Sequence, residues 1–153
     1  MTSSAKQHIF FVDDEPGVRK AVGGTLEQNG WAVSCFASAG DCLKQFDFQK
    51  CDLLITDVKM PEMDGMELLT EVKRRAPWVP VLPVTGYGNV PRAARALKKG
   101  ADDFVEKPLE RKGLLSAVES ALRRSPNDSL LGKSPTPAEM RILRLILDSK
   151  SEK

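Results

Sequence analysis

Short, largely apolar runs alternate with longer amphipathic stretches, and this alternation constrains the fold of the chain more than any other feature. The runs are Ile9–Val12, Ala32–Phe36, Leu53–Thr56, Val81–Thr85 and Phe104–Val105. Apolar residues at consecutive positions are typical of parallel strands that are buried on both faces. The pattern therefore predicts a parallel sheet covered on both sides.

The stretches between these runs have helical spacing. The expected helices are about Pro16–Gln28, Ala39–Phe48, Gly65–Arg75, Asn89–Lys98 and Leu109–Arg124. Pro16 and Gly30 stand where the start and stop signals of the first helix belong. Five strands alternating with five helices predict a doubly wound α/β domain over residues 6–124, with a five-stranded parallel sheet.

The composition suits a soluble globular protein and excludes several classes. Of 153 residues, 41% are hydrophobic and 29% are charged, and the net charge of +2 favours no particular partner. No apolar run approaches the roughly 20 residues that cross a bilayer, and residues 1–8 lack the apolar core of a signal peptide. The three cysteines (Cys35, Cys42 and Cys51) form no CxxC pair, so neither a disulfide framework nor a zinc site is indicated. We expect a cytoplasmic protein with reduced thiols and no membrane partner.

Residues 125–137 have the composition of a linker, with prolines at 126, 135 and 137. An amphipathic stretch at about 138–148 follows, and its apolar residues Met140, Leu143, Ile146 and Leu147 share one helix face. One helix of this length cannot hold a core alone. We expect residues 138–153 to be the start of a further domain.

Polar side chains follow the predicted strands at their carboxyl ends. Asp13 and Asp14 follow the first strand, Asp57 the third and Lys107 the fifth, and Thr85 ends the fourth. Open α/β sheets bind ligands outside the carboxyl ends of their strands, where the strand order reverses. With the order 2-1-3-4-5, these five side chains converge on one pocket.

Three carboxylates held together repel one another and raise each other's pKa unless a cation is present. Mg²⁺ suits a site with few carboxylates and several waters. Lys107 and the Thr85 hydroxyl could hold the oxygens of a phosphate. The sequence therefore predicts a site for Mg²⁺ and an anion.

Each of these signals also has an ordinary structural explanation. Asp13 and Asp14 could cap the helix that begins at Pro16, and Asp57 could be an acid in a loop. Thr85 could belong to a turn, and Lys107 could be a solvated lysine before a proline. Their joint placement at the ends of four strands favours the site.

The motifs around these residues resemble a known family. Val12-Asp-Asp-Glu-Pro, Ile55-Thr-Asp-Val-Lys-Met-Pro-Glu-Met-Asp-Gly, Val84-Thr-Gly and Phe104-Val-Glu-Lys-Pro are similar to motifs of the receiver domain of bacterial two-component response regulators. They occur in the family's order and spacing within residues 6–124. The resemblance implies a flavodoxin-like fold with the strand order 2-1-3-4-5.

The resemblance also implies a role for each matching residue. Asp57 would be the phosphoacceptor, taking a phosphoryl group from a phosphohistidine of a sensor histidine kinase. Asp14, Asp57 and the backbone carbonyl of Lys59 would hold Mg²⁺, and Asp13 would hold it through water. The ion would neutralise charge on the transferring group. The chain would catalyse only its own phosphorylation and dephosphorylation, so we do not expect an enzyme.

A phosphoryl group on Asp57 would act as a switch. Lys107 would pair with one of its oxygens, Thr85 would move to donate a hydrogen bond to another, and Phe104 would turn inward. The surface that changes would be the fourth helix, fifth strand and fifth helix. Basic residues (Arg92, Arg95, Lys98, Lys99) precede acidic ones (Asp102, Asp103, Glu106, Glu110) there. Such opposite charges suit a two-fold dimer face, and equally a solvated surface.

The segment Val84–Pro91 and the tail at 135–151 resemble regulators whose output domain is a helix-turn-helix of the LuxR kind. If so, the recognition helix that enters the major groove lies outside this chain. The chain itself should then bind DNA poorly, and DNA would be a partner only through the missing part of that domain.

Three residues or pairs depart from the family pattern. Pro83 interrupts the fourth predicted strand, where it removes a ladder hydrogen bond and could create a bulge. Gly23 and Gly24 lie within the first helix and should each weaken it by about 1 kcal/mol unless a close backbone contact offsets the loss. Lys59 places a cation beside the site.

Other functions are compatible with parts of the pattern. A stand-alone receiver could relay phosphate or bind a partner protein. A Mg²⁺-dependent phosphatase with Asp57 as nucleophile would need a further acid or base, and the only histidine, His8, precedes the first apolar run. A pseudo-receiver that does not take up phosphate is opposed by the complete set of Asp13, Asp14, Asp57, Thr85 and Lys107.

Overall fold

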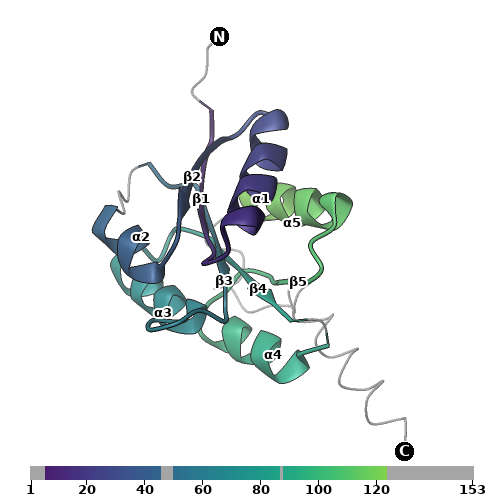
Figure 1. The fold of residues 1–153 in the computed structure, drawn as a ribbon. Coiled ribbons are helices and arrows are strands. Elements are labelled where there is room, and N and C mark those ends of the chain that lie inside the picture. The colour runs from purple at the N-terminus through teal and green to yellow at the C-terminus, as the bar shows by residue number, and fades with distance from the viewer. Residues whose placement is uncertain (1–5, 46–49, 87, 124–153) are drawn as a thin grey trace, which may run out of the picture.

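Five parallel strands form one sheet in the order β2-β1-β3-β4-β5 (Figure 1). The strands are β1 (His8–Val12), β2 (Ala32–Phe36), β3 (Leu53–Asp57), β4 (Val81–Thr85) and β5 (Val105–Glu106). The structure is a computed structural model that describes residues 6–45, 50–86 and 88–123. The predicted doubly wound, flavodoxin-like arrangement is confirmed.

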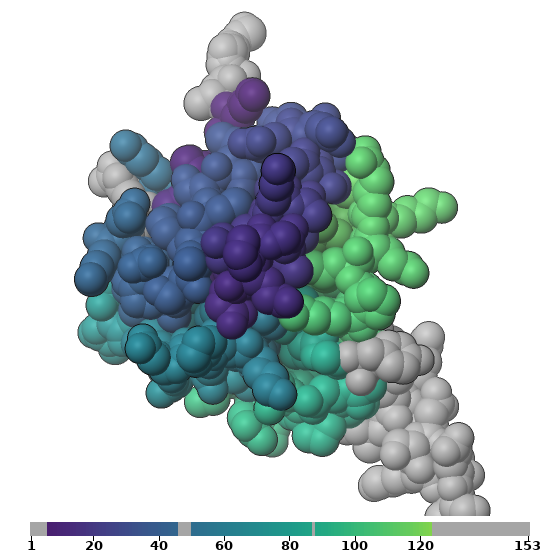
Figure 2. Space-filling model, viewed as in Figure 1, coloured from purple at the N-terminus to yellow at the C-terminus, as the bar shows by residue number. Residues whose placement is uncertain are grey.

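Five helices cover the sheet: α1 (Pro16–Gln28), α2 (Ala39–Gln45), α3 (Gly65–Arg75), α4 (Val90–Lys98) and α5 (Arg111–Arg123). The predicted helix ends were wrong at two places, because Asn89 caps α4 from outside and Leu109 precedes α5. The last predicted residues of α2, 46–48, lie outside the described part. In the space-filling view α5 (green) lies beside α1 (purple to blue), and teal segments form the lower side (Figure 2).

Consecutive strand residues face opposite layers of the core. Ile9 and Phe11 of β1 pack in the cluster that includes residues of α1 and α5. Phe10 and Val12 pack in the cluster that includes residues of α2 and α3. All four side chains are at most 4% exposed. Burial on both faces is therefore the physical reason that β1 is apolar at every position after His8.

Local side-chain contacts fix the two ends of α3. At its start, Asp64 accepts from the backbone N–H of Glu67, and the Glu67 carboxylate accepts from the backbone N–H of Asp64, which is a capping box. Such caps contribute about 1 kcal/mol. At its far end, Lys73 donates to the carbonyls of Pro77 and Val79.

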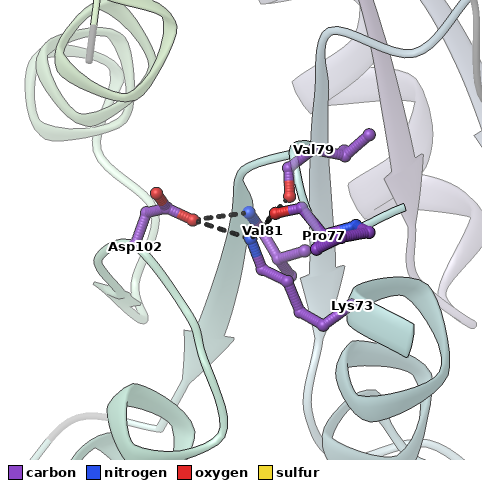
Figure 3. A network of polar contacts seen from close by, with 5 residues as sticks. All are labelled: Lys73, Pro77, Val79, Val81 and Asp102. Atoms are coloured by element: carbon purple, nitrogen blue, oxygen red, sulfur yellow. Dashed lines mark hydrogen bonds and ion pairs between the residues drawn. The ribbon is translucent and has the colours of Figure 1, made fainter. Parts of the chain in front are cut away.

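Lys73 also connects α3 to the other side of β4. Its ammonium lies 3.4 Å from an Asp102 carboxylate oxygen, and the same oxygen accepts from the backbone N–H of Val81 (Figure 3). Gly100, with φ of 109°, leaves room for the Lys73 stem, since a Cβ there would lie 3.4 Å from its Cγ. This network joins the end of α3, the start of β4 and the segment before β5.

Pro83 lies within a regular strand, so the expected bulge was wrong. It pairs with Thr56 in an unbroken register between β3 and β4. The carbonyls of Val81 and Thr85 accept hydrogen bonds from N–H groups on the β5 side. Because backbone groups of every second strand residue point to the same side, the Pro83 nitrogen also points toward β5. Pairing with β5 begins only at Val84, so the Pro83 nitrogen faces a position before β5 starts, and its lack of an N–H removes no hydrogen bond of the β4–β5 ladder.

The linker predicted at 125–137 and the helix predicted at 138–148 lie outside the described residues. Within the described part of the chain, no helix combines the length and the apolarity that a membrane crossing requires.

The adjacent glycines of α1 differ in their surroundings. A Cβ on Gly23 would meet the Cys35 sulfur of β2 at 3.2 Å, whereas a Cβ on Gly24 would have no neighbour within 4 Å. Neither glycine makes the close backbone contact that could offset the helix penalty, and the contact at Gly23 is with a side chain.

We expect Gly24→Ala to raise the free energy of unfolding by about 0.5–1 kcal/mol, because alanine favours the helix and restricts the unfolded chain. Gly23→Ala should gain clearly less, since its methyl group presses on Cys35. Urea unfolding of the two variants and the wild type would check this. Equal gains would show that the contact with Cys35 carries no cost.

Candidate metal and phosphoryl site

The sheet order places the carboxyl ends of β1 and β3 side by side. Val12 is opposite Thr56 in their register, so Asp13 and Asp57 occupy the next positions. One carboxylate oxygen from each of Asp13, Asp14 and Asp57 lies within 4.8 Å of the others. The structure therefore brings the three predicted acids together.

Asp13 is 1% exposed, and its two oxygens have different surroundings. Oδ1 accepts from the backbone N–H of Glu15 at 2.9 Å, while Oδ2 is buried without a partner among the described residues. Burial raises the pKa of Asp13, and the negative charges of Asp57 and Asp14 add to the rise. The N-cap of α1 is Glu15, whose side chain makes no capping bond, so the alternative in which Asp13 and Asp14 cap that helix was wrong.

Asp57 ends β3 and is 4% exposed. Its Oδ2 lies 3.3 Å from the Lys107 ammonium, which comes from the segment after β5. Burial raises the pKa of Asp57, and the positive charge of Lys107 offsets only part of the rise. Burial opposes the charge on Lys107, but attraction to Asp57 and Asp13 outweighs it and raises the pKa of the ammonium.

Thr85 ends β4, and its hydroxyl oxygen is buried without a hydrogen-bond partner among the described residues. Its carbonyl accepts from the backbone N–H of Lys107 at 2.8 Å, which fixes the two predicted site residues to each other. Phe104 is 1% exposed and packs with Ala93 of α4. The aromatic side chain is thus already inside, beside α4.

The site opens to solvent as a depression. It is lined by Asp14, Glu15, Asp57, Lys59, Met60, Pro61 and Lys107. Polarity of the Lys59 backbone lowers the pKa of Asp57, against the larger effect of burial. The metal-binding role of the Lys59 carbonyl stays a prediction.

These residues fit a hard divalent cation. Three carboxylates converge, two of them have raised pKa values because of burial and mutual repulsion, and Asp13 Oδ2 has no donor. Oxygen ligands of this kind are those that Mg²⁺ prefers. Asp13, Asp14 and Asp57 are the side chains that could hold it.

Sequence reasoning missed two residues that position the site. Arg19 of α1 donates to the Asp13 carbonyl at 2.7 Å and holds the segment after β1. Gly65 approaches β3 so closely that a Cβ would lie 2.3 Å from the Asp57 carbonyl oxygen. Its N–H donates to the Val58 carbonyl at 2.8 Å. Gly65 ends the family motif that begins at Ile55, but the sequence alone did not predict its contact with β3.

The charged residues expected on one dimer face are divided by the structure. Arg92, Arg95 and Lys99 line a groove on the α3 side of α4. Asp103, Glu106 and Glu110 line a different depression beside α5. Asp102 pairs with Lys73. The basic and acidic residues predicted to pair across one dimer face therefore lie in separate places on the surface.

Comparisons with known proteins agree with the site. Residues 9–119 match the family described as response regulator receiver domain. The chain is 37% identical over 122 residues to the transcriptional regulatory protein FixJ of Bradyrhizobium diazoefficiens, covering 80% of this chain and 60% of FixJ. It is 36% identical over 149 residues to the C4-dicarboxylate transport transcriptional regulatory protein DctD of Rhizobium meliloti, covering 97% of this chain and 30% of DctD.

Solved structures show the same fold. A response regulator receiver domain protein from Clostridium thermocellum superimposes with a TM-score of 0.73 at 33% identity, covering 76% of this chain and 94% of that one. The chain belongs to the response regulator receiver domain family. It spans 27–60% of the length of the curated relatives it matches.

Gly65→Ala should destabilise the protein by about 1–3 kcal/mol, because a methyl group there forces the loop after β3 away from Asp57. Gly113→Ala in α5 is the matched control, since a Cβ at that position meets nothing within 4 Å. Thermal unfolding of both variants gives the comparison. Equal stability of the two would show that the loop moves at no cost.

Mg²⁺ should raise the unfolding temperature, because the ion relieves repulsion among the three acids. In Asp13→Asn we expect the metal-free protein to be more stable than the wild type, because burial and the neighbouring acids, which raise the pKa of Asp13, no longer act on a charge there. The response to Mg²⁺ should shrink in the same variant. Calorimetry with EDTA and with MgCl₂ would test this, and an undiminished response would remove Asp13 from the metal site.

Proposed function

We propose that this chain is the phosphoacceptor module of a response regulator, and that Asp57 takes a phosphoryl group from a sensor histidine kinase in the presence of Mg²⁺. The observation that carries the proposal is the placement of the Asp57 carboxylate between two further acids and the Lys107 ammonium. Acids alone would suit a cation, and the lysine adds the group that an incoming phosphoryl oxygen needs.

The transfer needs little from the protein beyond position and charge. An oxygen of Asp57 forms the bond to phosphorus while the bond from phosphorus to the kinase imidazole nitrogen breaks, and that nitrogen keeps the electron pair. Bound Mg²⁺ supplies charge neutralisation on the phosphoryl oxygens. Asp13 and Asp14 would hold the ion with Asp57 and the Lys59 carbonyl. Lys107 exchanges its contact with Asp57 for one with a phosphoryl oxygen.

The switch begins at Thr85, whose hydroxyl is buried without a partner among the described residues. A phosphoryl oxygen on Asp57 would give this donor an acceptor, which attracts Thr85 toward the site. Phe104 packs against Ala93 of α4, so a change around Thr85 would be transmitted to α4, β5 and α5. This face would control the output, as a dimer surface or as a docking site.

The output would be transcription. GlrR, FixJ and DctD, which match most of this chain, are transcriptional regulatory proteins by name, and TodT and TmoT are named response regulator proteins. Solved structures that cover the tail are titled NtrX from Brucella abortus and the response regulator StyR. We propose a DNA-binding output of the helix-turn-helix kind, beginning at residue 138. The chain would have no enzymatic role beyond its own phosphorylation and dephosphorylation.

Incubation with Mg²⁺ and acetyl phosphate should add one phosphoryl group to the wild type. Intact-mass spectrometry should detect an adduct that is labile to base and absent from Asp57→Asn. Asp41→Asn is the control, because Asp41 is an exposed acid on α2 that belongs neither to the acid cluster nor to the lining of the depression. The adduct should form on this control as on the wild type.

The outcomes separate the candidate functions. An adduct on Asp57→Asn equal to that on the wild type would place the phosphoacceptor elsewhere. No adduct together with no Mg²⁺ binding would leave a pseudo-receiver. If the adduct forms on the wild type, light scattering of the phosphorylated protein would show whether phosphorylation produces dimers.

A further inference from the structure

A groove of about 660 Å³ lies between α3 and α4, and apart from Lys59, which also lines the depression at Asp57, its lining has no part in the metal and phosphoryl chemistry described above. Its apolar lining comes from Val58, Met60 and Met66. One wall is the first turns of α3, with Asp64 and Glu67. The opposite wall belongs to α4 and is cationic.

The α4 wall carries Arg92, Arg95 and Lys99. Spacings of three and four residues place them in one stripe along the helix. Ala93 and Ala96 of the same helix are buried. Because the helix turns 100° per residue, Lys98 lies on a different side of α4 from the stripe, and it does not line the groove.

No residue of the stripe forms an ion pair in the part of the chain that the structure describes, although Asp64 and Glu67 lie on the opposite wall of the groove. The ion pairs found there involve Lys73, Arg74, Arg75 and Lys107. Like charges one turn apart destabilise a helix by a few tenths of a kcal/mol per pair. The fold therefore carries a small cost that a bound anion would relieve.

The shape of the charge distribution favours a protein segment over a small polyanion. Positions 92 and 99 are about 10 Å apart along the axis of a helix. Acidic side chains repeated with the same spacing on a partner helix would meet all three cations in turn. Pyrophosphate would concentrate its charge at one point of the stripe, whereas a protein segment can also place an apolar side chain against Met60 and Met66.

We propose that the α3–α4 groove is a docking site for an acidic amphipathic helix of a partner protein. Arg92, Arg95 and Lys99 would pair with its carboxylates, and the methionines would receive an apolar side chain. This interaction goes beyond phosphoacceptance, and it uses a side of α4 away from the packing with Phe104.

The test uses the full chain and a short fluorescein-labelled helical peptide. The glutamates of the peptide repeat with the spacing of Arg92, Arg95 and Lys99, and one leucine lies beside them. We expect saturable binding by fluorescence anisotropy, with an affinity about tenfold lower for Arg95→Glu, equivalent to roughly 1.4 kcal/mol. Lys98→Glu makes the same charge change on the same helix outside the groove and should alter the affinity less than about twofold. Circular dichroism would confirm that both variants are folded.

A reversed charge pair supplies the second measurement. A peptide with lysine in place of the glutamate that faces position 95 should bind Arg95→Glu better than it binds the wild type. Absence of saturable binding, equal losses in Arg95→Glu and Lys98→Glu, or failure of the reversed pair would overturn the proposal. Binding of inorganic pyrophosphate to the stripe without binding of the peptide would overturn it in favour of a small anion.

Discussion

The repulsion among three carboxylates at the ends of β1 and β3 is the interaction on which the site depends. The fold creates it, because the order β2-β1-β3-β4-β5 makes β1 and β3 neighbours. Hydrophobic packing on both faces of these strands supplies the free energy that holds the acids together. Burial is the main cause of the raised pKa values of Asp13 and Asp57, and repulsion between the acids adds to it. A cation is the group that removes the cost, and a phosphoryl group arriving with it adds negative charge that Lys107 can meet.

Backbone contacts keep this arrangement from relaxing. Gly65 lets the start of α3 lie directly on the Asp57 carbonyl, and the Asp64 capping box fixes where that helix begins. Arg19 holds the segment after β1 by its contact with the Asp13 carbonyl. Because these contacts come from α1 and α3 on opposite faces of the sheet, the acids are restrained from both sides.

The fold and the convergence of the site could be predicted from the sequence, because both depend on local patterns. Strand residues that are apolar at every position indicate burial on two faces, and parallel strands bring their carboxyl ends to one edge. The sequence could not predict toward which neighbouring element an individual backbone or side-chain group points in the folded protein. Pro83 was expected to disturb β4, but its nitrogen faces a position before β5 begins. Gly65 gave little signal because its role depends on a contact with β3.

The cations of α4 show the same limit. Arg92, Arg95, Lys98 and Lys99 are close together in the sequence. The packing of α4 through Ala93 and Ala96 determines that all of them except Lys98 line the groove beside α3. That orientation has a consequence for regulation. Lys59 and Met60 line both the groove and the depression at Asp57, so the loop after β3 is a common wall of the two. If a ligand in one depression shifts this wall, it changes the affinity of the other by a factor that must be equal in both directions. A helix in the groove and a phosphoryl group on Asp57 would then be linked through the loop after β3, a route separate from Thr85 and Phe104.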